Sequence, residues 1–241
     1  MSALRLQPWP LDREKRVRDV DAIFRRVAPR YDALTRLLSL GQDRRWKRAL
    51  IARLPPPRPG AAILDLATGT AELPALLRAA GRDDRVVALD RSRPMLAKAH
   101  RKRLPGVRYV VGDLNAIPVA AGRFDAVLMG YGLRYPTDLG ATLAAIHRAL
   151  RPGGVFLSLD FGVPENPIAR RAYVAYLLAA GTTWGALLHG RASTYWHIVE
   201  SIRAYPGQRV VAGLMRDLGF ERVSVEERVF GTSVILRGER A

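Results

Sequence analysis

Short apolar runs alternate with segments of helical periodicity over most of the chain. Strands are predicted at residues 62–67, 85–90, 107–111, 124–129 and 155–161. Helices are predicted between or after them, at about 71–80, from Ser92 with Pro94 just inside the start, at 138–150 and at 208–218. Strands that alternate with helices form a parallel sheet with helices on both faces. The sequence therefore predicts an α/β fold, doubly wound around a mostly parallel sheet.

Both ends of the chain depart from this alternation. Apolar residues recur at helical spacing from Val17 to Val27, which predicts an amphipathic helix over 17–28, and a further helix is expected at about 43–53. Near the C-terminus, the predicted strands 221–227 and 232–237 are too close in sequence for a crossover helix between them. They must pair antiparallel, as a hairpin at one edge of the sheet.

Residues 162–206 interrupt the pattern with a segment rich in glycine, proline and aromatic residues. We expect a lid there, inserted over the carboxyl ends of the strands. Within it, residues 172–188 carry no charge, which reaches the lower length limit of a membrane-spanning helix. The segment contains Gly181 and Gly185, so an apolar wall is the favoured interpretation. The domain prediction is an N-terminal tail with helices covering the site over 1–55, followed by one α/β domain over 56–241.

The turn after the first predicted strand carries the clearest chemical signal. It holds one glycine, Gly69, whereas a dinucleotide site needs Gly-x-Gly-x-x-Gly to seat a pyrophosphate on the helix N-terminus. Asp90 ends the next strand, where a carboxylate is placed to accept both hydroxyls of a ribose. These residues predict a nucleoside-bearing cofactor without a pyrophosphate, and S-adenosylmethionine (SAM) fits better than a dinucleotide.

Composition excludes several other classes of protein. Hydrophobic residues make up 49% and charged residues 25%, as in an ordinary soluble globular protein. The absence of cysteine removes disulfides, thiolate nucleophiles and zinc–sulfur sites, and we expect no metal site. The first ten residues lack the apolar core of a secretory signal, which favours a cytoplasmic location.

The net charge of +17 has three interpretations. The first is binding to nucleic acid, but the charges are spread along the whole chain without the basic–aromatic pattern of an RNA-binding module, so no specific nucleic acid is expected. Attraction to an anionic membrane surface is the second interpretation, because the first fifty residues carry 13 Lys/Arg against 6 Asp/Glu. The third is a basic surface that reflects the arginine-rich composition alone.

Four stretches resemble motifs of the ubiquinone/menaquinone biosynthesis C-methyltransferase family, which includes the demethylmenaquinone methyltransferases. They are F-R-R-V-A-P-R-Y-D at 24–32, G-Q-D-R-R-W-K at 41–47, G-L-R at 132–134 and Y-W-H-I-V-E-S-I-R-A-Y-P-G-Q at 195–208. The resemblance covers roughly residues 20–240. It implies the class I methyltransferase fold, with a Rossmann-like sheet and an antiparallel strand at its edge. It also implies SAM-dependent methylation of a ring carbon in a polyprenylated quinol precursor.

The resemblance assigns roles to residues of this chain. The implied cofactor contacts are Asp65, Ala67, Gly69, Thr70, Asp90, Arg91, Asp113, Leu114 and Gly130. Arg134, Tyr31 and His197 are the candidate catalytic residues, and Tyr135 and Tyr195 the candidate substrate contacts. Arg134 is expected to favour the phenolate without acting as a free base, since a guanidinium stays protonated. A lipophilic quinol is the implied partner, together with a peripheral membrane contact and, by analogy alone, a homodimer.

The chain departs from the family pattern at three positions. The family's second turn glycine is Ala71, as it is in menaquinone-type members that carry Gly-Thr-Ala. Tyr135 replaces the asparagine of G-L-R-N, and His197 replaces the second tyrosine of Y-x-Y-L. The last two positions fall where substrate would lie. They leave open another small aromatic or isoprenoid acceptor, and a non-catalytic member of the fold is the third alternative.

Overall fold

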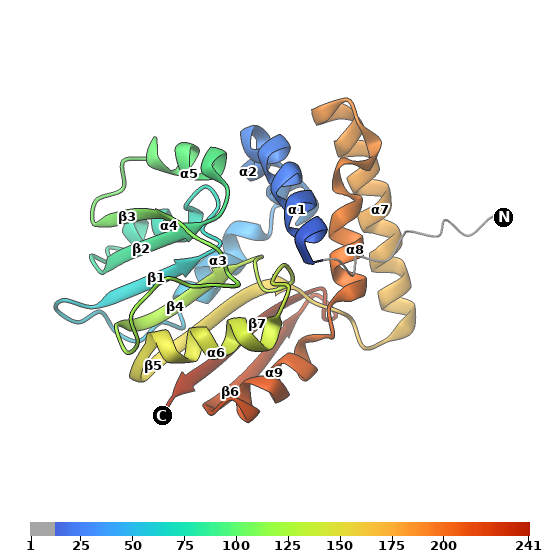
Figure 1. The fold of residues 1–241 in the computed structure, drawn as a ribbon. Coiled ribbons are helices and arrows are strands. Elements are labelled where there is room, and N and C mark those ends of the chain that lie inside the picture. The colour runs from blue at the N-terminus through green and yellow to red at the C-terminus, as the bar shows by residue number, and fades with distance from the viewer. Residues whose placement is uncertain (1–12) are drawn as a thin grey trace.

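The computed structural model describes residues 13–241, which form a seven-stranded sheet with helices on both faces (Figure 1). The strand order is β3-β2-β1-β4-β5-β7-β6, and β1 to β5 run parallel. The strands are β1 (Ala62–Leu66), β2 (Arg85–Asp90), β3 (Val107–Val111), β4 (Phe124–Gly130), β5 (Leu150–Phe161), β6 (Phe220–Arg228) and β7 (Ser233–Arg240). The predicted doubly wound α/β fold is confirmed.

The predicted C-terminal hairpin is also confirmed. Strand β7 pairs antiparallel with both β5 and β6, so β6 is the outermost strand at that edge. Ser233 pairs with Phe161, the last residue of β5. The tip of the hairpin therefore lies at the edge of the sheet where the parallel strands end.

Each face of the sheet has its own apolar core, because successive strand residues point to opposite faces. Ile63 packs in one core with helices α3 (Asp43–Ile51), α4 (Glu72–Ala79) and α5 (Arg93–His100). Its neighbour Leu64 packs in the other core with α6 (Leu139–Ala149) and α9 (Gln208–Asp217). The sheet is therefore shielded on both sides, and its carboxyl edge is the place left for a site.

Helices from both ends of the sequence gather at this edge. Figure 1 shows α1 (Arg13–Val27) running between α5 and α8 (Trp196–Ala204), with α7 (Pro167–His189) on the outside. Helix α2 (Tyr31–Leu38) contacts α7, where Tyr176 donates a hydrogen bond to the Leu38 carbonyl oxygen at 3.0 Å. The helices predicted over 17–28 and 43–53 correspond to α1 and α3, whereas α2 was not predicted.

Residues 162–206 contain more helix than their composition indicates. Helix α7 begins after Asn166, whose side chain accepts hydrogen bonds from the backbone of Ile168 and Ala169, and it ends at Gly190. Its Gly181 and Gly185 let the 3-10 turn Ala192–Tyr195 pack closely, since a Cβ on Gly185 would lie 2.6 Å from the Arg191 carbonyl oxygen. Among the helices described, α7 included, none is both long and apolar enough to cross a membrane.

Candidate active site

The turn between β1 and α4 has an unusual backbone. Ala67, Gly69 and Ala71 all adopt the left-handed conformation, with φ of 51°, 57° and 60°. For a residue with a Cβ this costs roughly 1–2 kcal/mol, so the two alanines carry strain that a glycine would avoid. Ala71, where the family pattern has glycine, thus keeps the glycine-like backbone. Hydrogen bonds from Thr68 N to Leu89 O and from Ala71 N to Thr68 O hold the turn in place.

Two carboxylates flank this turn, and their hydrogen bonding differs. Asp65 is buried; its Oδ2 accepts a hydrogen bond from the Thr68 hydroxyl, and its Oδ1 has no partner among the described residues. Burial raises the pKa of Asp65 to about 7. Asp90 accepts hydrogen bonds from the backbone N–H groups of Gly69 and Ser92, each at 2.7 Å. Burial raises the pKa of Asp90 as well, although these hydrogen bonds oppose the shift.

A cavity at the carboxyl edge, here called the main cavity, collects most of the predicted cofactor residues. It is lined by Ala67, Gly69, Asp90, Arg91, Asp113, Leu114 and Gly130. The other two, Asp65 and Thr70, line a smaller inner cavity beside the turn, which shares Ala67, Gly69 and Gly130 with the main cavity. The structure therefore brings together all nine residues that the sequence analysis proposed for the cofactor.

Helix α1 closes one side of the main cavity, and the sequence analysis assigned a site role to none of its residues. Val20, Asp21 and Phe24 line it, and Arg91 joins the helix to the strand ends. The Arg91 guanidinium donates to Asp21 Oδ2 at 3.0 Å and to Asp113 Oδ2 at 2.9 Å. No local motif could have identified Asp21, because its partner lies 70 residues away in the sequence.

Gly132 makes room for the turn. A Cβ at this position would lie 2.8 Å from the Ala67 Cβ and 2.9 Å from Met129 Cγ. We predict that Gly132→Ala displaces Ala67 and weakens binding of S-adenosylhomocysteine at least tenfold, because the turn can no longer approach the ligand as closely. Calorimetric titration measures the affinity.

Gly213, inside α9, is the matched control for this substitution. Nothing lies within 4 Å of a Cβ placed there. Gly213→Ala should leave the affinity unchanged and raise the free energy of unfolding by up to about 1 kcal/mol, the helix-propensity difference between the two residues. Equal affinities for the two variants would contradict the steric explanation.

A third cavity, here called the aromatic cavity, contains the remaining candidates. All five predicted catalytic and substrate residues line it: Tyr31, Arg134, Tyr135, Tyr195 and His197. Apolar side chains of α1, α2 and α8 complete the wall. Phe24, Tyr31, Tyr131 and Tyr135 line both this cavity and the main cavity. The two cavities are therefore neighbours that share one aromatic wall.

Arg134 is a buried cation in that wall. Its Nε donates to Asp160 Oδ1 at 2.6 Å and its Nη1 donates to the Ser201 hydroxyl. The guanidinium carbon lies 5.2 Å from the ring centroids of both Tyr135 and Phe161. Burial alone would lower the pKa of Arg134, but the Asp160 carboxylate outweighs it and the pKa is raised. Sequence reasoning found Arg134 and quoted the E-S-I-R motif that holds Ser201, but it gave no role to Asp160.

His197 is buried and neutral. Its Nδ1 lies 3.0 Å from the Thr194 carbonyl oxygen, which requires the proton on Nδ1 and leaves Nε2 as an acceptor. Burial lowers the pKa of His197 to about 4, opposed by the hydrogen bond to Thr194. Tyr195, beside it in the cavity wall, has a buried hydroxyl without a hydrogen-bond partner among the described residues.

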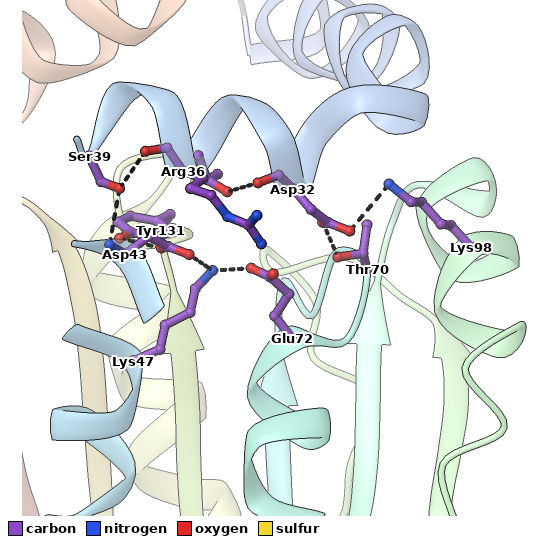
Figure 2. A network of polar contacts seen from close by, with 10 residues as sticks. Asp32, Arg36, Ser39, Asp43, Lys47, Thr70, Glu72, Lys98 and Tyr131 are labelled. Atoms are coloured by element: carbon purple, nitrogen blue, oxygen red, sulfur yellow. Dashed lines mark hydrogen bonds and ion pairs between the residues drawn. The ribbon is translucent and has the colours of Figure 1, made fainter. Parts of the chain in front are cut away.

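A network of charged groups ties the N-terminal helices to the turn. Figure 2 shows Lys47 of α3 between two carboxylates, Asp43 and Glu72. The Tyr131 hydroxyl donates to Asp43 Oδ1 at 2.8 Å. In the same view, Asp32 accepts a hydrogen bond from the Thr70 hydroxyl. The motifs at 24–32 and 41–47 contain Asp32, Asp43 and Lys47, but the sequence alone does not predict that these side chains meet the turn.

Solved structures with a similar fold include SAM-dependent methyltransferases. A SAM-dependent methyltransferase from Thermotoga maritima has a TM-score of 0.64 at 19% identity, with 91% of this chain and 99% of that chain covered. Phosphoethanolamine N-methyltransferase 2 from Haemonchus contortus, solved with S-adenosylhomocysteine, has a TM-score of 0.61 at 17% identity, over 81% of this chain and 52% of that chain. The fold of this chain is the class I methyltransferase fold.

Sequence comparison identifies the family. A profile described as the ubiE/COQ5 methyltransferase family matches residues 11–240, and the chain belongs to this family. The ubiquinone/menaquinone biosynthesis C-methyltransferase UbiE of Rubrivivax gelatinosus is 36% identical over 230 residues, covering 95% of this chain and 89% of the relative. The protein of the same name from Shewanella halifaxensis is 34% identical, covering 95% of this chain and 93% of the relative. The resemblance stated from the motifs is confirmed.

Proposed function

We propose that the protein transfers a methyl group from SAM to a ring carbon of a polyprenylated quinol precursor in respiratory quinone biosynthesis. The acceptor proposed is demethylmenaquinol-like. The observation that carries this proposal is the aromatic cavity, which is apolar, holds one buried guanidinium and shares a wall with the main cavity. The names of the relatives from Rubrivivax gelatinosus and Shewanella halifaxensis support it.

The proposed orientation of the cofactor spans the main and inner cavities. Asp90 accepts the ribose hydroxyls, and Asp113 with Leu114 lies beside the adenine. The buried Oδ1 of Asp65 has no hydrogen-bond partner in residues 13–241, and it is suited to accept a hydrogen bond from the α-ammonium group of the methionine end. Gly69 and Gly130 line both cavities and allow the backbone to approach the ligand between them. Bound SAM supplies an electrophilic methyl group carried by a sulfonium.

The residues of the aromatic cavity prepare the acceptor. A quinol ring carbon becomes nucleophilic as a ring hydroxyl loses its proton, so the site must stabilise a developing phenolate. Arg134 supplies the positive charge, and its contacts with Asp160 and Ser201 fix its position. His197 Nε2 is the proposed proton acceptor, because Nδ1 already carries its own proton; the His197 pKa of about 4 must rise when the developing phenolate lies beside it. The aromatic and aliphatic walls exclude water and orient the ring carbon toward the methyl group.

A second acceptor class, a small aromatic or isoprenoid molecule other than a quinol, rests on two side chains. Tyr135 and His197 both line the aromatic cavity and both depart from the family pattern. His197 lines the aromatic cavity but not the main cavity, so its effect should fall on the acceptor, whereas Tyr135 lines both cavities.

Cofactor binding is predicted to depend on pH through Asp65. Its pKa of about 7 in the free site means that half of the molecules hold a proton there at neutral pH. An α-ammonium group selects the ionised carboxylate, so binding lowers this pKa and releases the proton. Affinity for S-adenosylhomocysteine should therefore fall as the pH drops below 7, by up to about tenfold per pH unit. Titration calorimetry in buffers of different ionisation enthalpy detects the released proton.

Asp65→Asn is the control for this effect. The variant should bind more weakly at pH 8 and show no slope between pH 5.5 and 8. A wild-type slope in Asp65→Asn would assign the pH dependence to another group.

The proposed reaction is tested with purified protein, SAM and a demethylated prenylquinone in two redox states. The quinol should be methylated on the ring, whereas the oxidised quinone should not, because it has no hydroxyl to deprotonate. Methylation of neither acceptor, with cofactor binding intact, would reject the quinol as substrate.

A further inference from the structure

The inner cavity contains one cation among the residues described as lining it, the ammonium group of Lys47. Lys47 is 4% exposed, and it shares the cavity with Asp65, Gly69 and Glu72. Burying an ammonium group is costly unless it is paired and hydrogen-bonded. The hydrogen-bond partners of Lys47 therefore decide what this ammonium group can bind in the inner cavity.

The hydrogen bonds of Lys47 leave one donor for a ligand. An ammonium group has three N–H donors. One donates to Asp43 Oδ2 at 2.8 Å and another to Glu72 Oε2. The nitrogen lies 5.4 Å from the centroid of the Tyr131 ring, another wall of the inner cavity. No hydrogen-bond acceptor among the described residues takes the third N–H.

The partners of Lys47 hold it in position. Asp43 precedes Lys47 by one helical turn in α3. Asp43 also accepts a hydrogen bond from the Tyr131 hydroxyl, which fixes these two neighbours of Lys47 relative to each other. Glu72 opens α4, directly after the turn that approaches the cofactor. Figure 2 shows the ammonium group between these two carboxylates. The third donor is thus oriented by groups on α3, α4 and the end of β4.

The charges of the inner cavity match an amino acid in zwitterionic form. Asp65 offers a buried oxygen that has no partner in the described part of the chain, which suits an ammonium group, and Lys47 offers a buried N–H for a carboxylate. We propose that Lys47 binds the α-carboxylate of SAM, opposite Asp65 at the α-ammonium. This inference rests on the cofactor orientation proposed above and is independent of the identity of the acceptor. It gives the N-terminal helices a direct part in cofactor binding.

Two ligands that differ by the carboxylate alone test this assignment. Calorimetric titration compares S-adenosylhomocysteine with its decarboxylated analogue, which keeps the adenosine, the thioether and the amine. The wild-type protein should prefer S-adenosylhomocysteine by roughly ten- to a hundredfold, the range of a hydrogen bond between charged groups. In Lys47→Met this preference should fall below about threefold.

Lys102→Met is the matched control. Lys102 lines a polar cleft together with Lys47 and Glu72, but it does not line the inner cavity. Its removal should leave the preference at the wild-type value. A purely structural role for Lys47 would weaken both ligands equally, and an unchanged preference in Lys47→Met would overturn the proposal.

Lys47→Met leaves the buried carboxylate of Asp43 and the half-buried carboxylate of Glu72 without their cation, so a second variant guards against misfolding. Lys47→Met combined with Asp43→Asn and Glu72→Gln removes the unpaired charges and should show the same lost preference. If the wild-type protein binds neither ligand, the proposed cofactor site itself is wrong. That result differs from binding without a carboxylate preference, which rejects Lys47 alone.

Discussion

Arg134→Ala is expected to abolish nearly all methyl transfer and to lower the free energy of unfolding by about 3–5 kcal/mol, the cost of breaking a buried ion pair. The substitution leaves the Asp160 carboxylate buried without its cation, and it removes the charge proposed to stabilise the phenolate. It also empties the space between the Tyr135 and Phe161 rings. Urea unfolding measures the stability, and a methyl-transfer assay under native conditions measures the turnover.

A second substitution separates the structural from the chemical effect. Arg134→Ala combined with Asp160→Asn removes the unpaired carboxylate, while the amide can still accept the backbone N–H of Leu133 or Phe161. The double variant should recover part of the stability without recovering turnover. Recovery of turnover would show that Arg134 acts on folding alone.

Asp90→Ala is expected to weaken S-adenosylhomocysteine binding by about 3 kcal/mol, roughly a hundredfold, because the hydrogen bonds that we propose the ribose hydroxyls donate to this carboxylate are lost. The backbone N–H of Gly69 also loses its carboxylate partner, which loosens the turn. Calorimetric titration gives the affinity directly.

Asp125 offers a comparison at the opposite edge of the sheet. Its carboxylate accepts the Ala62 N–H at 2.8 Å and pairs with Arg58 and Arg151, close to where β1 begins. Asp125→Ala should leave the affinity within about twofold of the wild type, since Asp125 lines neither of the cavities that we assign to the cofactor. A similar loss of affinity in both variants would mean that the Asp90 effect is general destabilisation.

The sheet could be predicted from the sequence because its strands are short apolar runs with turn residues between them. The hairpin followed from the small number of residues between its strands. Helices α2, α7 and α8 were missed, because their form depends on contacts with one another more than on local pattern. Gly181 and Gly185 look like helix breakers in the sequence, yet they face the 3-10 turn Ala192–Tyr195 and allow it to pack.

The residues that line the cavities also fall into two groups, those that the sequence predicts and those that it does not. The turn and the strand-end carboxylates follow from local sequence, and motif resemblance supplied Arg134, Tyr135 and His197. Asp160 and Lys47 could not be assigned roles in this way. Asp160 is buried beside Arg134 through strand pairing, and the contact of Lys47 with Glu72 joins residues 25 positions apart. Only the folded chain brings such partners within hydrogen-bond distance.

The measurement that tests the central claim most directly is methyl transfer from SAM with a deuterated methyl group to a mixture of reduced demethylated prenylquinols, one with a naphthalene and one with a benzene ring. Mass spectrometry of the products locates the label. The account predicts labelled methyl on a ring carbon of at least one quinol, with the naphthalene ring preferred. Label on oxygen, or no labelled quinol from a protein that binds SAM, would contradict it.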